Sequence, residues 1–336
     1  MKLQAILYLT LVSTSAVEAA SRQHPVSTSS TRNEYLSQRT ALLDEMMIAS
    51  KRQRQQTQKE GDRIKDVIQA FDPQNEQNGL AAFKFLTLLA SSPLFVSEFW
   101  QTKPLLLRSS EMIEIAQNSC DTNDIDNNSD DAKVKVNGLT HTHTHTHTHT
   151  HTHTHTHNWV DGSFTIERDL KLIDGSYISG SRTDDILRSG IKTDSWAFRP
   201  IKDDPARRTT WEEVDDALQG GTIYFNSAGS FWPTLGALCR LTNYAFGLPT
   251  NINIYITPPG AVVSVPPHTD RQDVLVFQTE GSKRWRVYGP PKRIKGKDPL
   301  NRGKGGDVIE KKELGNPILD VVLRRGDGKF YFVVLI

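Results

Sequence analysis

The sequence has few of the features that define several common protein classes. Only two of its 336 residues are cysteines, Cys120 and Cys239, and neither belongs to a Cys-x-x-Cys pair. The sequence therefore indicates neither a zinc site nor a disulfide framework. The net charge of +1 gives no electrostatic reason to expect binding to nucleic acid or to a membrane surface. With 37% hydrophobic and 24% charged residues, the chain can form a globular core.

Long apolar runs are also absent, and the N-terminus carries a shorter one. Lys2 precedes the apolar stretch Ala5–Val12, and small residues follow, including Val17 and Ala19. This is the pattern of a signal peptide, and it is too short to span a membrane. We interpret residues 1–20 as a candidate signal peptide, with a loose tail or a misassigned start as the alternatives.

Histidine is scarce outside one tract. Nine of the eleven histidines alternate with threonine from His141 to His157, and the other two are His24 and His268. The tract lies in the low-complexity interval 111–160, which cannot form a core by itself. Alternating histidines could bind Ni or Zn loosely, but a repeated CA dinucleotide also encodes this pattern. We predict an expanded surface loop with no catalytic role.

Helical patterns occupy several parts of the chain. After a polar stretch, residues 33–71 look helical, because apolar side chains recur at helical spacing near the end of this range. Thr210 and Glu213 form a capping-box pattern before a helix through Leu218. Pro233 begins another helix, which Gly247 ends. Cys239 falls in its apolar pattern, so we expect a buried thiol.

The most informative stretch is 251–288. Three runs read as strands, Asn253–Thr257, Val274–Thr279 and Lys283–Tyr288. His268 and Asp270 are two residues apart, so both can point to one face of an extended segment. An imidazole and a carboxylate on one face are two of the three ligands that hold non-haem Fe(II).

The order of residues along this stretch resembles that of the JmjC-type 2-oxoglutarate oxygenases. The resemblance is closest to the ribosomal oxygenase branch, the family of bifunctional lysine-specific demethylases and histidyl-hydroxylases. It rests on Asn253, Tyr255, Thr257, Pro258, Pro259, His268, Asp270, Gln278, Gly281, Lys283 and Trp285, with Phe277 in place of a leucine. Upstream, Phe95, Phe99, Trp100, Lys103, Pro104 and Leu105 match the family's first motif, which leads into a strand. Near the end of the sequence, 317–323 and Gly326, Asp327 and Tyr331 match its closing strands.

The resemblance implies a mainly β fold with N-terminal helices, a double-stranded β-helix of the cupin or jelly-roll type. Together with the composition of the chain, it predicts the candidate signal peptide (1–20), a polar and helical region (21–79), a first JmjC segment (80–110), the low-complexity insertion (111–160) and the JmjC-like core (161–336). No histidine follows His268 in the 336 residues. We therefore expect a β-helix that is truncated and incomplete at its last strand, from a shortened gene model or from an iron-free relative.

The resemblance also implies a site. His268 and Asp270 would bind Fe(II), and the third histidine ligand is missing. Lys283 would pair with the far carboxylate of 2-oxoglutarate, a charge-assisted contact that makes a buried ammonium tolerable. Asn253 and Tyr255 would form hydrogen bonds in the same site. Ascorbate would serve as the reductant in vitro.

Three functions are consistent with the sequence. The first is hydroxylation or lysine demethylation of a ribosomal protein or histone, in the nucleus or nucleolus by resemblance. The secretory pathway or an organelle would replace that location if residues 1–20 act as a signal. The second is a non-catalytic JmjC-like protein-binding module. The third is a cupin with another metal and small-molecule chemistry, which Lys283 argues against because that lysine suits a dicarboxylate cosubstrate.

Overall fold

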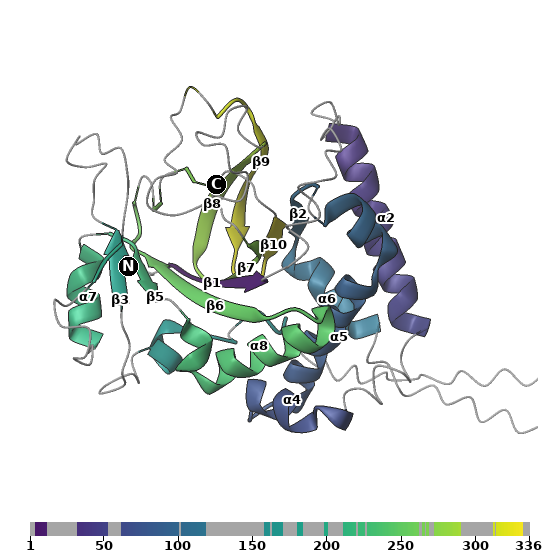
Figure 1. Ribbon diagram of the computed structural model, residues 1–336, viewed down its shortest axis with the longest axis horizontal. Helices are drawn as coiled ribbons and strands as arrows, with labels where there is room; N and C mark the ends of the chain where they lie inside the picture. Colours follow the sequence, from purple (N-terminus) through teal and green to yellow (C-terminus); the bar gives the residue numbers. More distant parts are fainter. Residues whose placement is uncertain are drawn as a thin grey trace, which may run out of the picture.

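Antiparallel strands and a layer of helices make up the described part of the protein (Figure 1). The computed structural model describes residues 4–11, 32–52, 62–100, 102–118, 158–161, 163–170, 180–183, 198–200, 211–219, 221–225, 227–261, 264–265, 267–268, 272–289, 312 and 314–331. The His-Thr tract, Asp270 and the basic loop after Tyr288 lie outside these residues.

Eight strands form one sheet in which all neighbours are antiparallel. Their order across the sheet is β2 (Leu105–Leu107), β10 (Gly328–Tyr331), β7 (Asp273–Glu280), β1 (Gln4–Leu11), β6 (Thr250–Thr257), β5 (Ile223–Phe225), β3 (Gly180–Thr183) and β4 (Phe198–Pro200). Two further strands, β8 (Ser282–Tyr288) and β9 (Pro317–Arg324), form a separate antiparallel pair.

The helices gather on one side of the large sheet. They are α2 (Arg32–Arg52), α4 (Lys65–Phe71), α5 (Glu76–Ser91), α6 (Ser109–Asn118), α7 (Trp211–Gln219) and α8 (Pro233–Phe246), with short turns η1 (Phe95–Phe99), η2 (Ile166–Leu170) and η4 (Ala228–Ser230). In Figure 1, α8 runs along β6, and α4 and α5 lie beyond it, while β8 and β9 rise from the opposite side.

Side-chain alternation along the strands produces two cores on the two faces of the sheet. On β7, Leu275 and Phe277 pack with the helices, whereas Val274 and Val276 pack with Trp285 of the small sheet. On β6, the fully buried Ile254 belongs to the helical core and its neighbour Tyr255 to the other. The space between the two sheets, lined by alternate residues of β6, β7, β8, β9 and β10, is called the inter-sheet layer below.

The N-terminal segment occupies a central position in the large sheet. Residues Gln4–Leu11, within the candidate signal peptide, pair with β6 along their full length and with β7 along most of it. A short continuous apolar run is typical both of a signal peptide and of a buried strand. In this structure the run is the strand that joins β6 to β7.

Both ends of the interval 111–160 belong to the folded part of the chain. Helix α6 covers its first residues, and Met112 and Ile115 are buried. At the other end, Trp159 is 1% exposed, and its ring lies 4.9 Å from that of Phe277 and 5.7 Å from that of Phe85. The residues around the tract thus help to build the helical core.

The structure confirms most of the predicted elements. The helix from Pro233 ends at Gly247, whose φ of +66° is the left-handed value that glycine adopts easily. The predicted strands in 253–288 and 317–323 appear as β6, β7, β8 and β9. Cys239 is partly buried, and burial raises the pKa of its thiol to about 12. Among the described helices, none is long and apolar enough to cross a membrane.

Candidate functional site

Lys283 connects the two sheets. It lies on β8 just after Gly281, whose φ of +69° allows the sharp corner between β7 and β8. From there its Nζ donates a 2.9 Å hydrogen bond to Oγ1 of Thr257 on β6. Thr257 is 3% exposed, and its hydroxyl oxygen lies 3.1 Å from that of Thr222. The amine therefore ends in the inter-sheet layer on a pair of buried hydroxyl groups.

The surroundings of this amine disfavour its charged form. The residue as a whole keeps some solvent exposure, but enough protein surrounds the amine that burial lowers the pKa of Lys283 from its ordinary 10.5 to about 7. A lysine with this pKa is close to half protonated at neutral pH. An anion bound beside it would favour the charged form again.

Asn253 and Tyr255 share a face of β6 with Thr257, as residues two apart must. The ring of Tyr255 lies 4.8 Å from that of Tyr224, its direct partner on β5. Asn253 is 5% exposed, and its Oδ1 accepts a 3.0 Å hydrogen bond from the backbone N–H of Ser227. Because Ser227 has a φ of +56°, this bond supports an uncommon turn conformation. Asn253 thus has a structural role that its sequence position did not reveal.

The predicted metal ligands are described only in part. His268 is 6% exposed, and Asp270 lies outside the described residues. Within the described ranges, no three His, Cys, Asp or Glu side chains come together as a metal-binding group. The described residues therefore fit Fe(II) only through the single buried imidazole of His268.

Lys329 is a second lysine in the inter-sheet layer, and the sequence reasoning missed it. It is 1% exposed on β10. Its Nζ lies 3.7 Å from the centroid of the Trp285 ring and 4.5 Å from that of Tyr331. The Nζ of Lys283 lies 5.7 Å from the same indole centroid. The strand Gly328–Tyr331 did carry a signal, because Lys329 lies two residues before Tyr331 and therefore on the same face of the strand.

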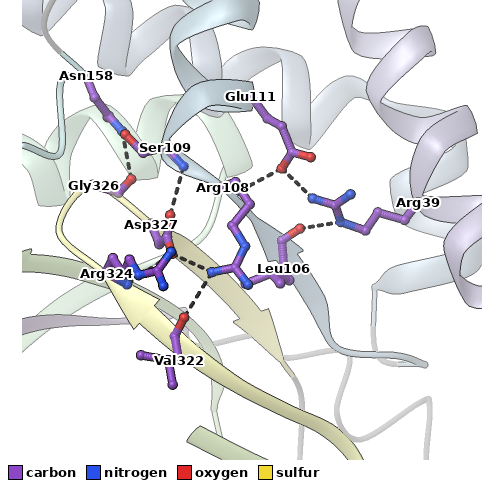
Figure 2. A network of polar contacts seen from close by, with 10 residues as sticks. All are labelled: Arg39, Leu106, Arg108, Ser109, Glu111, Asn158, Val322, Arg324, Gly326 and Asp327. Atoms are coloured by element: carbon purple, nitrogen blue, oxygen red, sulfur yellow. Dashed lines mark hydrogen bonds and ion pairs between the residues drawn. The ribbon is translucent and has the colours of Figure 1, made fainter. Parts of the chain in front are cut away.

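A polar network fixes the turn that precedes β10 (Figure 2). Asp327 is 4% exposed and accepts hydrogen bonds from Nη1 of Arg108 (2.7 Å), from the backbone N–H of Ser109 (2.9 Å) and from that of Arg324 (3.0 Å). Arg108 also donates to the carbonyl of Val322 on β9. The carboxylate therefore joins the segment after β2 to the β9–β10 turn.

Asn158 and Gly326 complete this junction. Nδ2 of Asn158 donates to the carbonyl of Gly326 (2.7 Å) and to Oγ of Ser109 (2.9 Å). Gly326 has a φ of +87°, and a Cβ at this position would lie 2.6 Å from Oγ of Ser109. Glycine is required there on both counts. The Gly-Asp motif thus positions β10, and with it Lys329.

The same network reaches α2 through the segment around β2. Glu111 accepts a hydrogen bond from the backbone N–H of Arg108 at 2.7 Å and forms an ion pair with Arg39. Nε of Arg39 also donates to the carbonyl of Leu106 at 2.8 Å. These contacts give the segment around β2 a structural role.

Comparison with known proteins connects this arrangement to one family. Residues 235–332 match the model of the JmjC domain. The chain is 35% identical over 117 residues to the bifunctional lysine-specific demethylase and histidyl-hydroxylase NO66 of Drosophila erecta, a match that covers 35% of this chain and 17% of that protein. The Drosophila mojavensis protein of the same name is 36% identical over 112 residues, a match that covers 33% of this chain and 12% of that protein. Ribosomal oxygenase 1 of Danio rerio is 28% identical over 183 residues, covering 52% of this chain and 33% of its own length. The chain thus spans a third or less of these relatives.

Proposed function

We propose that the chain binds 2-oxoglutarate in the inter-sheet layer as a JmjC-type protein oxygenase. The match of residues 235–332 to the JmjC domain model and the similarity to ribosomal oxygenases support this proposal. The fold of the chain on this proposal is the double-stranded β-helix. The observation that carries the proposal is the amine of Lys283, which crosses from β8 to Thr257 on β6 in a buried, polar environment. A cation in this position suits the far carboxylate of a dicarboxylate cosubstrate.

His268 and Asp270 would hold Fe(II), which when bound supplies the oxygen chemistry that hydroxylates a substrate C–H group. The chain's own residues orient the cosubstrate and limit the access of water. Lys283 pairs with the far carboxylate, and Thr257 fixes the direction of the amine. Tyr255 and Trp285 surround them with aromatic surface. Tyr255 and Asn253 complete the set of cosubstrate contacts that we propose.

The relatives' names specify lysine demethylation and histidyl hydroxylation or a ribosomal oxygenase, and they support a protein substrate for this chain. We propose a ribosomal protein or a histone, and with it a nuclear or nucleolar location. On a methylated lysine, hydroxylation gives an unstable hydroxymethyl amine that releases formaldehyde. On a histidine side chain the hydroxyl group remains.

The test is cosubstrate binding by calorimetry. The 336-residue chain without His141–His157 avoids adventitious metal binding by the tract. We expect Lys283→Ala to weaken 2-oxoglutarate binding more than tenfold, because it leaves a buried carboxylate unpaired. The matched control is Lys65→Ala, at an exposed lysine on α4. Equal affinity of the Lys283 variant and the parent chain would remove Lys283 from the site.

A second candidate function is a non-catalytic JmjC-like binding module. The observation that favours it is Lys329, a second buried lysine in the inter-sheet layer, whose amine lies over the same indole as that of Lys283. Succinate formation with iron, ascorbate and 2-oxoglutarate separates the two functions. An oxygenase produces succinate above the level of its His268→Ala variant, whereas a binding module does not.

A further inference from the structure

A pair of threonine hydroxyl groups lies behind the amine of Lys283. Oγ1 of Thr257 accepts the 2.9 Å hydrogen bond from Nζ of Lys283, and the same oxygen lies 3.1 Å from Oγ1 of Thr222. Thr222 and Thr257 are 1% and 3% exposed. Three segments of the chain, the start of β5, the end of β6 and the start of β8, thus meet at one hydroxyl oxygen.

The strand register brings the two threonines together. Ile223 of β5 pairs with Ile256 of β6, so continuing this antiparallel register by one residue places Thr222 opposite Thr257. Side chains directly opposite each other in an antiparallel pair are close enough to form a hydrogen bond. The position of the Thr222 hydroxyl is therefore set by the pairing of β5 with β6.

The hydrogen-bonding capacity of each group sets the direction of these contacts. An ammonium group has three donors and no acceptor, so a charged Lys283 can only donate to Thr257. A threonine hydroxyl has one proton to donate and two lone pairs that accept. While Thr257 accepts from the amine, its own proton goes to a second acceptor, and the oxygen of Thr222 lies at hydrogen-bond distance. In that arrangement Thr222 turns a lone pair of Thr257 toward the amine.

Burial gives this arrangement energetic weight. A buried hydroxyl without an acceptor for its proton is costly. Hydrogen bonds in a chain also polarise one another, so an oxygen that donates its own proton becomes a better acceptor for the next donor. The contact with Thr222 therefore strengthens the bond between Thr257 and the charged amine of Lys283.

We propose that Thr222 is a positioning residue for Lys283, which acts through Thr257 to hold the amine in its charged form for the cosubstrate carboxylate. The inference rests on the proposed function for the identity of that ligand. The effect of Thr222 on the amine itself needs no ligand, so it can be measured separately.

The contrasting interpretation is that the two threonines only join β5 to β6, as cross-strand threonine pairs do. The two interpretations differ in what Thr222→Val changes. Both predict a loss of stability, because valine removes the hydroxyl and nearly preserves the shape of the side chain. Only the positioning role predicts a lower pKa of Lys283, because the charged amine then has a weaker acceptor.

NMR titration of the full chain with isotopically labelled lysine measures this pKa, and Lys283→Met identifies the resonance. We expect Thr222→Val to lower the pKa of Lys283 by about half a pH unit, a roughly threefold change in the protonation equilibrium, and Thr222→Ser to restore it. Thr222→Ala takes the place of the valine variant if that variant is unfolded.

Thr242→Val on α8 is the matched control. Its hydroxyl is also buried, and it donates to the carbonyl of Leu238 at 2.8 Å. We expect this variant to lose a similar amount of stability and to keep the Lys283 pKa of the parent chain. The control thus separates the loss of a buried hydrogen bond from a change at the amine.

A double-mutant cycle tests whether Thr222 acts through Thr257. In the Thr257→Val background the series of hydrogen bonds is already broken, so Thr222→Val should lower the Lys283 pKa no further. The other described titratable side chains that face the inter-sheet layer near this amine, Lys329, Tyr331 and Tyr255, are the same in every variant. Their effects on the pKa therefore cancel in the comparison.

Binding of 2-oxoglutarate with Fe(II) at pH 8 gives a second readout, in the chain without His141–His157. We expect roughly threefold weaker binding in Thr222→Val, because a larger share of the Lys283 amine is neutral before the ligand binds. Thr222→Ser and Thr242→Val should bind as the parent chain does.

Two results would overturn the inference. One is a Lys283 pKa that is the same in the parent chain and in the folded Thr222→Val and Thr222→Ala variants. The other is a pKa shift from Thr222→Val that is equally large with and without the Thr257 hydroxyl. If Lys283→Ala leaves 2-oxoglutarate binding unchanged, the proposed function fails, whereas the pKa comparison still decides the role of Thr222.

Discussion

The amine of Lys283 and the hydroxyl of Thr257 join the two sheets of the protein through one 2.9 Å hydrogen bond. Thr257→Val removes the acceptor and nearly preserves the shape of the side chain. Because the hydrogen bond favours the charged amine, we expect the pKa of Lys283 to fall below its present value of about 7. We also expect a loss of about 1 kcal/mol in the free energy of unfolding.

NMR titration of isotopically labelled lysine measures this pKa directly. Thr250→Val is the matched control, since its hydroxyl lies on the same strand and donates to the carbonyl of Leu248 instead. A Lys283 pKa that is the same in the Thr257 variant and the control would show that the hydroxyl does not hold the amine.

The lowered pKa of Lys283 also predicts a pH dependence of stability. The unfolded chain binds this proton up to about pH 10.5, whereas the folded chain releases it near pH 7. Between these values the unfolded state binds more protons, so stability contributed by this group rises with pH, by at most about 1.4 kcal/mol per pH unit. Below pH 7 both states are protonated, and the full cost of the buried charge is present.

Denaturant unfolding of the parent chain and of Lys283→Met between pH 6 and pH 10 checks this sign. The difference in free energy of unfolding, parent minus variant, should increase with pH. A constant difference across this pH range would mean that Lys283 has the same pKa in the folded and the unfolded chain.

Asp327 should be among the most sensitive positions outside the inter-sheet layer. Its carboxylate accepts hydrogen bonds from Arg108, Ser109 and Arg324, and Asp327→Ala leaves these donors without their acceptor. We expect a loss of about 3 kcal/mol in the free energy of unfolding. Asp320→Ala is the control, because its ion pair with Arg284 is exposed and should contribute little. Equal effects of the two substitutions in chemical denaturation would argue against the network.

The central position of β1 predicts that the N-terminus is needed for the fold. Deleting residues 2–11 leaves one edge of β6 and one of β7 without the partner they have in this structure. We expect a large loss of stability and faster amide exchange in both strands. Deleting only residues 2 and 3, which precede the strand, is the control. A deletion of 2–11 that melts at the parent temperature would show that β1 is dispensable.

Much of the local structure was predictable, because its signals are local. Pro233 and Gly247 mark the two ends of α8, and alternation identifies β6, β7 and β8. The family resemblance pointed to Lys283, and the structure places its amine in the inter-sheet layer.

Features that depend on contacts between distant segments were not predictable in this way. The apolar run at Gln4–Leu11 has the same composition as a signal peptide, and only its pairing with β6 and β7 identifies it as a strand. Trp159 lies beside a low-complexity tract, yet it is buried among Phe71, Phe85 and Phe277. The role of Asn253 depends on the turn at Ser227, which belongs to another segment.

Proton uptake on ligand binding tests most directly whether Lys283 pairs with the carboxylate of the cosubstrate. At pH 8 an amine with a pKa of about 7 is mostly neutral in the free protein, and pairing with a carboxylate requires it to be charged. Calorimetry of 2-oxoglutarate binding in buffers of different ionisation enthalpy counts the protons taken up. The account predicts an uptake close to one proton for the parent chain and close to zero for Lys283→Met. Tight binding by the parent chain with no proton uptake would contradict it.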